Sequence, residues 1–149
     1  MVESPHVIFV VTCIDRRLHK AGAFASLAEK QFGKEAYIAS SAGGAKALAD
    51  PPDPAKRIAI LLDIGLVKEL VGIDTVVIAD HDAKCAAYRI DDLKTEEQAH
   101  RENLERAAEV VQASFPDLRV ILAMTRIGPD DKLQQIEVLK EVPPKTALA

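Results

Sequence analysis

An unbroken apolar run over residues 7–11, with the sequence Val-Ile-Phe-Val-Val, constrains the fold more than any other feature of the chain. A continuous run of β-branched and aromatic residues of this length indicates a strand that is buried on both faces. In open α/β sheets, ligands and reacting groups gather just beyond the carboxyl ends of such strands. We therefore expect a strand over residues 7–12, followed directly by chemically active side chains.

The remainder of the chain alternates strand-like and helix-like patterns. The expected helices cover residues 18–32, 55–70 and 96–115, and the further expected strands cover residues 36–39, 74–79, 118–125 and 133–139. This order predicts a parallel sheet with right-handed crossovers and helices on both faces. A turn over residues 128–131 predicts that the last strand pairs with the one before it as a hairpin. The fold class is therefore α/β, a mostly parallel β-sheet of four parallel strands plus an antiparallel edge strand, flanked by helices.

The helical patterns also predict the surroundings of particular side chains. His19 falls early in its helix and is expected to be solvated, and His100 is expected to be solvated or paired. Asp53 is expected to cap the helix over residues 55–70, with Pro54 at its first position. This helix carries a broad apolar face formed by Ile58, Leu61, Leu62, Gly65, Leu66 and Leu70.

Length and composition are those of one domain. A chain of 149 residues is long enough to bury a sizeable core. The core is expected to be aliphatic, since 48% of the residues are hydrophobic and only 4% are aromatic. We expect residues 1–149 to form a single domain, with the lead over residues 1–6 and the tail over residues 142–149 loosely held.

Charge and hydropathy argue against several classes of protein. The net charge is -4, and no basic stripe suggests a nucleic acid partner. No apolar run approaches the ~20 residues of a membrane span, and no charged-then-apolar leader is present. We therefore expect a cytoplasmic protein. In that reducing compartment, Cys13 and Cys85 are not expected to form a structural disulfide.

Three residues with reactive side chains come directly after the first strand: Cys13, Asp15 and Arg17. Asp15 and Arg17 are two positions apart, so in an extended segment they point the same way. Taken alone, Cys13 is typical of a small buried hydrophobe, and the charged pair is typical of a protein surface. The interpretation of these residues therefore depends on the side chains at the ends of the other strands.

The second and third strands also run into segments with chemical character. The second leads to Ala42, Gly43 and Gly44, where small residues allow close approach and bare N–H groups can face an anion. The third leads to His81 and Cys85. Residues four apart lie on one face of a helical turn, so this histidine and cysteine can ligate the same metal ion.

A zinc site is the interpretation that joins Cys13, His81 and Cys85. If the first and third strands are neighbours, the three side chains can meet at one edge of the sheet. Two thiolates and an imidazole are good zinc ligands, and three protein ligands with an open fourth position are typical of catalytic zinc. Bound zinc brings the pKa of water down toward ~7, which makes hydroxide available near neutral pH.

The order of these motifs resembles the β-class carbonic anhydrase family. The resemblance rests on Cys-x-Asp-x-Arg at residues 13–17, on Ala-Gly-Gly at residues 42–44, and on His81 and Cys85 after the third strand. It covers the chain from about residue 7 to the final hairpin. It implies a β-carbonic anhydrase-like fold with an active site built at a dimer interface, and hence a homodimer or a higher homo-oligomer.

The resemblance also implies roles for single residues. Cys13, His81 and Cys85 match the family's Zn²⁺ ligands, and Asp15 and Arg17 match its catalytic pair. In the family, the arginine holds the carboxylate away from zinc in the active state, and the freed aspartate can occupy the fourth position in an inactive state. The implied reaction is reversible hydration of carbon dioxide to bicarbonate by zinc-bound hydroxide, with the Ala-Gly-Gly segment lining the substrate pocket.

Three positions depart from the family pattern. The later ligands are spaced His-x-x-x-Cys instead of His-x-x-Cys, which makes Asp82 a further candidate ligand. Ala86 stands where glycine commonly follows the second cysteine, and Ser40 and Ser41 stand where Arg-Asn commonly precedes Ala-Gly. Two alternatives stay open: a related zinc hydrolase acting on carbon disulfide or carbonyl sulfide, and a zinc- or anion-binding protein without catalysis.

Overall fold

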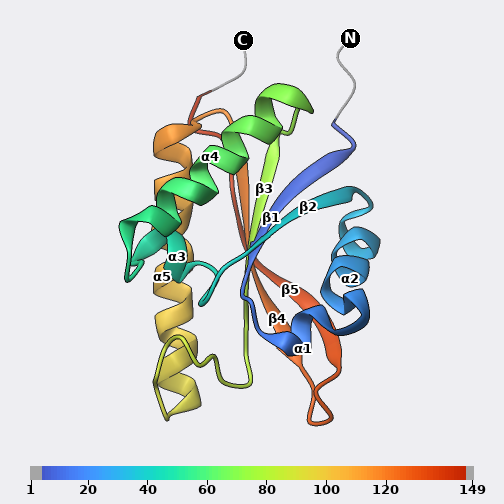
Figure 1. Cartoon of the computed structure of the whole chain (residues 1–149), viewed down its shortest axis with the longest axis vertical. Helices are drawn as coiled ribbons and strands as arrows, with labels where there is room; N and C mark the ends of the chain where they lie inside the picture. The colour runs from blue at the N-terminus through green and yellow to red at the C-terminus, as the bar shows by residue number, and fades with distance from the viewer. Residues whose placement is uncertain (1–4, 147–149) are drawn as a thin grey trace.

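The structure is a computed structural model that describes residues 5–146. Its centre is a five-stranded sheet with the strand order β2-β1-β3-β4-β5 (Figure 1). The strands are β1 (Val7–Thr12), β2 (Glu35–Ser40), β3 (Thr75–His81), β4 (Arg119–Ile127) and β5 (Leu133–Val142). Strands β2, β1, β3 and β4 run parallel, whereas β5 pairs with β4 antiparallel. The predicted fold class is therefore confirmed.

The two central strands are apolar on both faces because both faces are covered. Every residue of β3 is buried, and in β1 only Val7 is partly exposed. Successive side chains of β1 enter opposite cores, since Phe9 packs in one cluster and Ile8 and Val10 pack in the other. Double burial is the arrangement that the unbroken apolar run predicted.

Helices form the layer on each face of the sheet. The helical segments are α1 (Arg16–His19), the 3₁₀ turn η1 (Lys20–Gly22), α2 (Ala23–Phe32), α3 (Lys46–Ala49), α4 (Pro54–Leu70) and α5 (Leu93–Ser114). Helices α3, α4 and α5 cover one face, where Leu48, Ile64 and Leu104 share a core (Figure 1). Helices α1 and α2 cover the other face, where Leu18 and Phe24 pack.

Helix boundaries differ from the prediction where the backbone or a cap decides them. The single helix expected over residues 18–32 is interrupted, because Ala21 and Gly22 have φ of 54° and 69°. Helix α5 begins earlier than expected, because the side chain of Asp92 accepts a hydrogen bond from the Thr95 N–H and caps its first turn. The predicted cap of α4 by Asp53 is confirmed.

Only part of the apolar surface of α4 faces the core. Ile60 and Ile64 are buried against the sheet. Ile58, Leu62 and Leu66 are exposed, although they belong to the broad apolar face that the sequence predicts. The helix therefore carries more apolar surface than the fold of one chain buries.

The C-terminal end of the described chain is held by backbone hydrogen bonds. Val142 pairs with Val120 at the end of β5, and the N–H groups of Lys145 and Thr146 both donate to the carbonyl of Pro116. Residues 1–4 of the predicted lead and residues 147–149 of the predicted tail lie outside the described residues, and the loosely held ends stay a prediction. Within the described part of the chain, no helix has the length and apolar character needed to cross a bilayer.

Candidate metal centre

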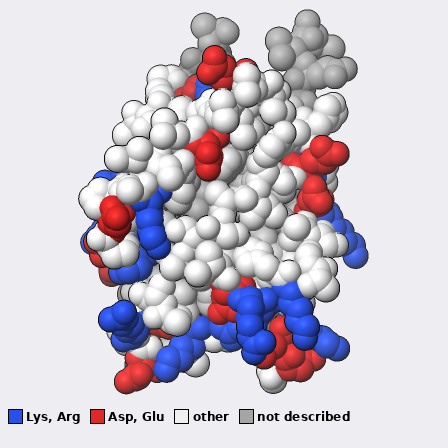
Figure 2. Space-filling view, in the orientation of Figure 1, with Lys and Arg blue, Asp and Glu red and all other residues white. Residues whose placement is uncertain are grey.

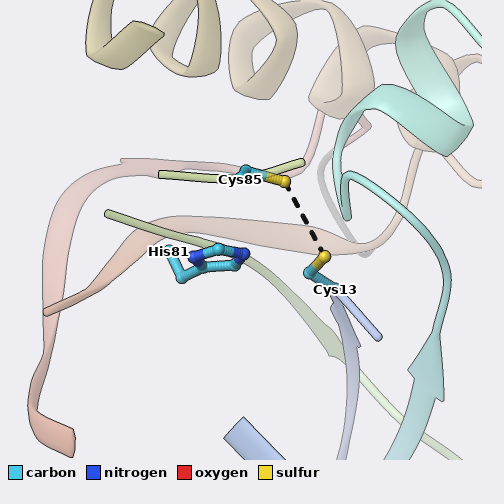
Figure 3. A group of neighbouring side chains, drawn as sticks. All are labelled: Cys13, His81 and Cys85. Carbon is cyan, nitrogen blue, oxygen red and sulfur yellow. Dashed lines mark hydrogen bonds between the residues drawn. The ribbon is translucent and has the colours of Figure 1, made fainter. Parts of the chain in front are cut away.

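Cys13, His81 and Cys85 converge at the carboxyl ends of the central strands (Figure 3). Cys13 directly follows β1 and His81 is the last residue of β3. These strands are neighbours, with Thr12 opposite Ala79. The ligand atoms of the three residues lie within 4.8 Å of one another, and all three residues are buried. The metal hypothesis required the first and third strands to be neighbours, and the sheet topology meets this requirement.

His81 offers one ring nitrogen to this group. Its Nδ1 lies 2.8 Å from the carbonyl oxygen of Asp82. Because a carbonyl only accepts, Nδ1 carries a proton, and in the neutral ring Nε2 keeps a free lone pair. Nε2 is buried and has no hydrogen-bond partner among the described residues. A buried polar atom without a partner is unfavourable, and a metal ion at this place would satisfy it.

The two cysteine sulfur atoms lie 3.9 Å apart. The hydrogen bond with Cys85, aided by the Gly43 N–H at 3.3 Å, lowers the pKa of Cys13 to about 4, although burial opposes the shift. The same hydrogen bond, together with burial, raises the pKa of Cys85. Near neutral pH the pair therefore holds one thiolate and one proton, and a cation that displaces the proton would meet two thiolates.

This donor set fits zinc. Thiolate sulfur and imidazole nitrogen are the ligands that borderline-soft Zn²⁺ prefers, and three of them are typical of catalytic sites. Burial is the largest single effect and lowers the pKa of His81, but the neighbouring Cys13, the Asp82 carbonyl and the charge of Asp15 together outweigh it, so that the pKa is raised overall. The environment of Nε2 thus attracts a positive charge. Cys13, His81 and Cys85 could therefore hold a zinc ion.

Asp15 and Arg17 form a closed pair beside the three ligands. Oδ1 of Asp15 accepts hydrogen bonds from the backbone N–H of Arg17 at 2.9 Å and from its Nε at 3.0 Å, and Oδ2 accepts from Nη2 at 2.9 Å. These hydrogen bonds lower the pKa of Asp15, so that its carboxylate is ionised at neutral pH. The spacing of the two residues suggested an extended segment. In the structure Asp15 instead caps α1, and Arg17 lies in the first turn of that helix.

The segment between His81 and Cys85 is not the helical turn that the spacing suggested. Ala83 and Lys84 have left-handed backbone, with φ of 56° and 70°. Arg17 donates from Nη1 to the carbonyl of Ala83 and from Nη2 to the carbonyl of Lys84, both at 2.9 Å. The His-x-x-x-Cys spacing is therefore accommodated by a left-handed turn whose carbonyls face one guanidinium.

The small residues after β2 lie against the first ligand. The N–H of Gly43 donates to Sγ of Cys13. Gly44 has φ of +57°, and a Cβ at this position would lie 2.5 Å from Oδ1 of Asp80, so only glycine fits. Ala45 donates its N–H to that same oxygen at 2.8 Å. Of the two glycine N–H groups that were expected to face an anion, that of Gly43 thus meets the Cys13 sulfur, and that of Gly44 donates to the carbonyl of Ser41 at 2.9 Å. The substrate-lining role of Ala42, Gly43 and Gly44 stays a prediction.

Three buried residues next to the centre were missed by the reasoning from sequence: Asp80, Glu96 and His100. Nδ1 of His100 donates to Oδ2 of Asp80 at 2.6 Å, and Nε2 of His100 lies 3.2 Å from Oε2 of Glu96. His100 is therefore paired and not solvated. Their positions in the sequence could have indicated them. Asp80 ends an apolar run directly before His81, and Glu96 and His100 are four residues apart on one predicted helix.

Two expectations for single residues are wrong. His19, expected to be solvated, is partly buried, and its Nε2 donates to the carbonyl of Cys13 at 2.7 Å. Asp82, the further candidate ligand, is engaged elsewhere. Its Oδ1 accepts from the N–H of Ile127 at 2.8 Å, and its Oδ2 lies 3.5 Å from Nη1 of Arg126. Both side chains therefore bind backbone or side-chain groups of the protein. His19 does not face solvent, and Asp82 does not point to the ligand group.

A cavity of about 300 Å³ lies between α5 and the segment that joins His81 to Cys85. Its walls include Ala83, Glu96 and His100. The residues of the Ala-Gly-Gly segment are not part of its lining.

The fold and the ligand group together define an α/β protein with a candidate metal centre at the carboxyl edge of its sheet.

Comparisons with known proteins give a likeness in structure. No protein-family model matches the chain, and no curated protein matches it significantly. Among solved structures, the β-carbonic anhydrase CcaA is similar with a TM-score of 0.54 at 11% identity, over 97% of this chain and 82% of that chain. A carbonic anhydrase from Streptococcus mutans has a TM-score of 0.48 at 15% identity, over 92% of this chain and 87% of that chain. The chain therefore has the fold of the β-class carbonic anhydrases, which confirms the resemblance at the level of the fold.

Proposed function

We propose that the protein is a zinc-dependent lyase that catalyses the reversible hydration of carbon dioxide to bicarbonate. The observation that carries the proposal is the buried group of Cys13, His81 and Cys85, in which Nε2 of His81 has no partner among the described residues. The structural likeness to the β-carbonic anhydrase CcaA supports the same activity.

In this proposal, Cys13, His81 and Cys85 hold Zn²⁺. When bound, zinc lowers the pKa of water and supplies a nucleophile at moderate pH. Two thiolate ligands donate negative charge, so we expect this pKa to lie higher than it would with neutral ligands. A reducing compartment such as the cytoplasm suits the site, because both cysteines are free thiols in the structure.

Asp15 is proposed to orient the attacking water. Its carboxylate is ionised and held by Arg17, and its Oδ2 lies 3.7 Å from Nε2 of His81. A carboxylate held next to the ligand group can accept a hydrogen bond from the water and direct a lone pair of the water oxygen toward the substrate carbon. The backbone of residues 42–44 is proposed to line the pocket of the linear substrate.

We also propose that the protein forms a homodimer or a larger homo-oligomer. Helix α4 exposes Ile58, Leu62, Leu66 and Leu70 at intervals of four residues. Figure 2 shows few charged side chains over the part of the surface where α4 lies. Exposed apolar patches of this kind mark interaction sites. A second copy packed antiparallel on this row would place Leu62 against Leu66 in a self-complementary contact.

Metal analysis and a hydration assay test the proposed activity. We expect purified protein to carry about one zinc per chain and Cys85→Ser to lose most of it, while Glu109→Gln, an exposed change on α5, leaves it unchanged. Zinc-loaded protein should hydrate carbon dioxide faster at about pH 9 than at about pH 7. Protein that never binds zinc, or no rate above background at either pH, would contradict the proposal. Turnover of carbonyl sulfide or carbon disulfide without carbon dioxide hydration would instead select the related zinc hydrolase.

A further inference from the structure

The third ligand, Cys85, comes directly after a turn that is unfavourable in isolation. Ala83 and Lys84 are consecutive left-handed residues, and neither is glycine. Such a conformation persists only where the surroundings over-determine it. Arg17 supplies one side of that support through the carbonyls of Ala83 and Lys84. The position of Cys85 therefore depends on contacts outside its own segment.

Glu96 supplies the other side of the support. Both of its carboxylate oxygens lie 3.1 Å from the backbone nitrogen of Cys85, which donates its N–H to them. Glu96 lies in the first turn of α5 and is 2% exposed. A hydrogen bond between a buried carboxylate and a backbone N–H is strong and directional. It fixes the peptide plane that precedes the ligand side chain of Cys85.

Glu96 is itself held by a chain of buried polar groups. His100, one turn further along α5, places Nε2 at 3.2 Å from Oε2 of Glu96 and donates from Nδ1 to Asp80 at 2.6 Å. Asp80 directly precedes His81 and accepts the N–H of Ala45 through its other oxygen. The chain of contacts thus connects the backbone beside His81 with the backbone of Cys85.

We propose that Glu96, backed by His100, is a positioning residue that holds Cys85 in the geometry required to bind the metal. The inference rests on the proposed zinc site and adds two residues to it. Within residues 5–146, no lysine or arginine side chain makes a hydrogen bond to Glu96, so its carboxyl oxygens are placed for the Cys85 N–H and for His100. Contacts of this kind around metal ligands alter metal affinity by about 10–100-fold when they are removed.

Zinc affinity of Glu96 variants tests the proposal. We expect Glu96→Ala to weaken zinc binding by about 10–100-fold, measured by competition with a chromophoric chelator. Glu96→Gln should recover much of the affinity, because its amide oxygen can still accept the Cys85 N–H. Glu97→Ala is the matched control, since the neighbouring carboxylate bonds Arg126 instead of the Cys85 segment.

Cobalt substitution gives a readout that a loss of stability alone would not change. We expect the thiolate-to-cobalt absorption bands of folded Glu96→Ala to shift or weaken, and those of Glu97→Ala to match wild type. If Glu96→Ala does not fold, Glu96→Asp is the second variant. It keeps the carboxyl group but moves it away from the Cys85 N–H, so the same losses are expected. Folded Glu96 variants with wild-type affinity and cobalt spectrum would overturn this inference and leave the proposed function intact. A wild type that binds neither metal would overturn both.

Discussion

Oδ2 of Asp15 lies 3.7 Å from Nε2 of His81, while the Asp15 carboxylate accepts three hydrogen bonds from Arg17. The carboxylate thus borders the ligand group and is held by the guanidinium. The same guanidinium also donates to the carbonyls of Ala83 and Lys84. Arg17 therefore organises two parts of the centre at once: the ionised acceptor and the turn that carries Cys85.

Arg17→Lys should weaken zinc binding by about 10-fold or more. A lysine ammonium is a single point donor, so it cannot satisfy the Asp15 carboxylate and two carbonyls together. Chelator competition measures the affinity, and Arg16→Lys on the exposed side of α1 is the control. Equal affinity of Arg17→Lys and wild type would show that the ligand turn does not depend on the guanidinium.

Lys84→Gly should stabilise the fold by about 0.5–1 kcal/mol. Removing a left-handed non-glycine residue relieves about 1–2 kcal/mol, and the added freedom of glycine in the unfolded chain offsets part of this gain. Lys84 is an exposed residue with φ of 70°, so little packing is lost. Urea unfolding measures the change. The nearby Ala86→Gly, where φ is negative, should destabilise the protein instead.

Gly44→Ala should destabilise the fold by about 2–4 kcal/mol. The new Cβ would lie 2.5 Å from Oδ1 of Asp80, in addition to the strain of φ at +57°. Gly33→Ala is the matched control, because its φ is +66° and nothing lies within 4 Å of a Cβ there. Denaturant unfolding of both variants separates the clash from the backbone strain. Equal losses of unfolding free energy in the two variants would mean that the Asp80 side chain can shift without cost.

Zinc binding should release protons and become tighter as the pH rises. The pKa of Cys13 is lowered to about 4, whereas the pKa values of Cys85 and His81 are raised. Below its raised pKa, Cys85 carries a proton that the metal must displace, and any protonated His81 must also lose its proton. Calorimetric titrations in buffers of different ionisation enthalpy count the released protons. Zinc affinity that is independent of pH between about 6 and about 8 would contradict the proposed ligand set.

Leu62→Glu should convert the proposed oligomer to monomers. Leu62 is 68% exposed in the middle of the apolar row on α4, and a carboxylate there would be buried without a partner in a dimer. Sedimentation velocity measures the oligomeric state. Leu93→Glu, a 56% exposed position on α5, should leave it unchanged. A monomeric wild type at micromolar concentration would contradict the proposed assembly.

Much of the fold can be predicted from local pattern. The apolar runs at β1 and β3 predict strands covered on both faces because they are short, rich in β-branched residues and apolar at every position. Helix boundaries were less predictable. The break at Ala21 and Gly22 lies inside a periodic apolar pattern, and a positive φ at alanine has no signature in the sequence.

Burial of polar groups was also beyond reasoning from sequence. Glu96 and His100 lie in a segment rich in charged residues, where local pattern predicts contact with water or with a neighbouring charge. They are buried because α5 packs across the end of β3, where Asp80 and the Cys85 N–H offer partners. On α4, both Ile60 and Leu62 are apolar, and only the position of the sheet decides that Ile60 is buried.

The sequence by itself determined the α/β fold class and the chemical identity of the three candidate ligands, because strand patterns and side-chain chemistry are local properties. The tertiary structure decided how Cys85 reaches Cys13 across 72 residues of chain. Its left-handed turn is held by Arg17 and by Glu96, which come from different elements. Spacing counts residues but does not specify backbone φ, so contacts between distant segments had to settle the geometry of the centre.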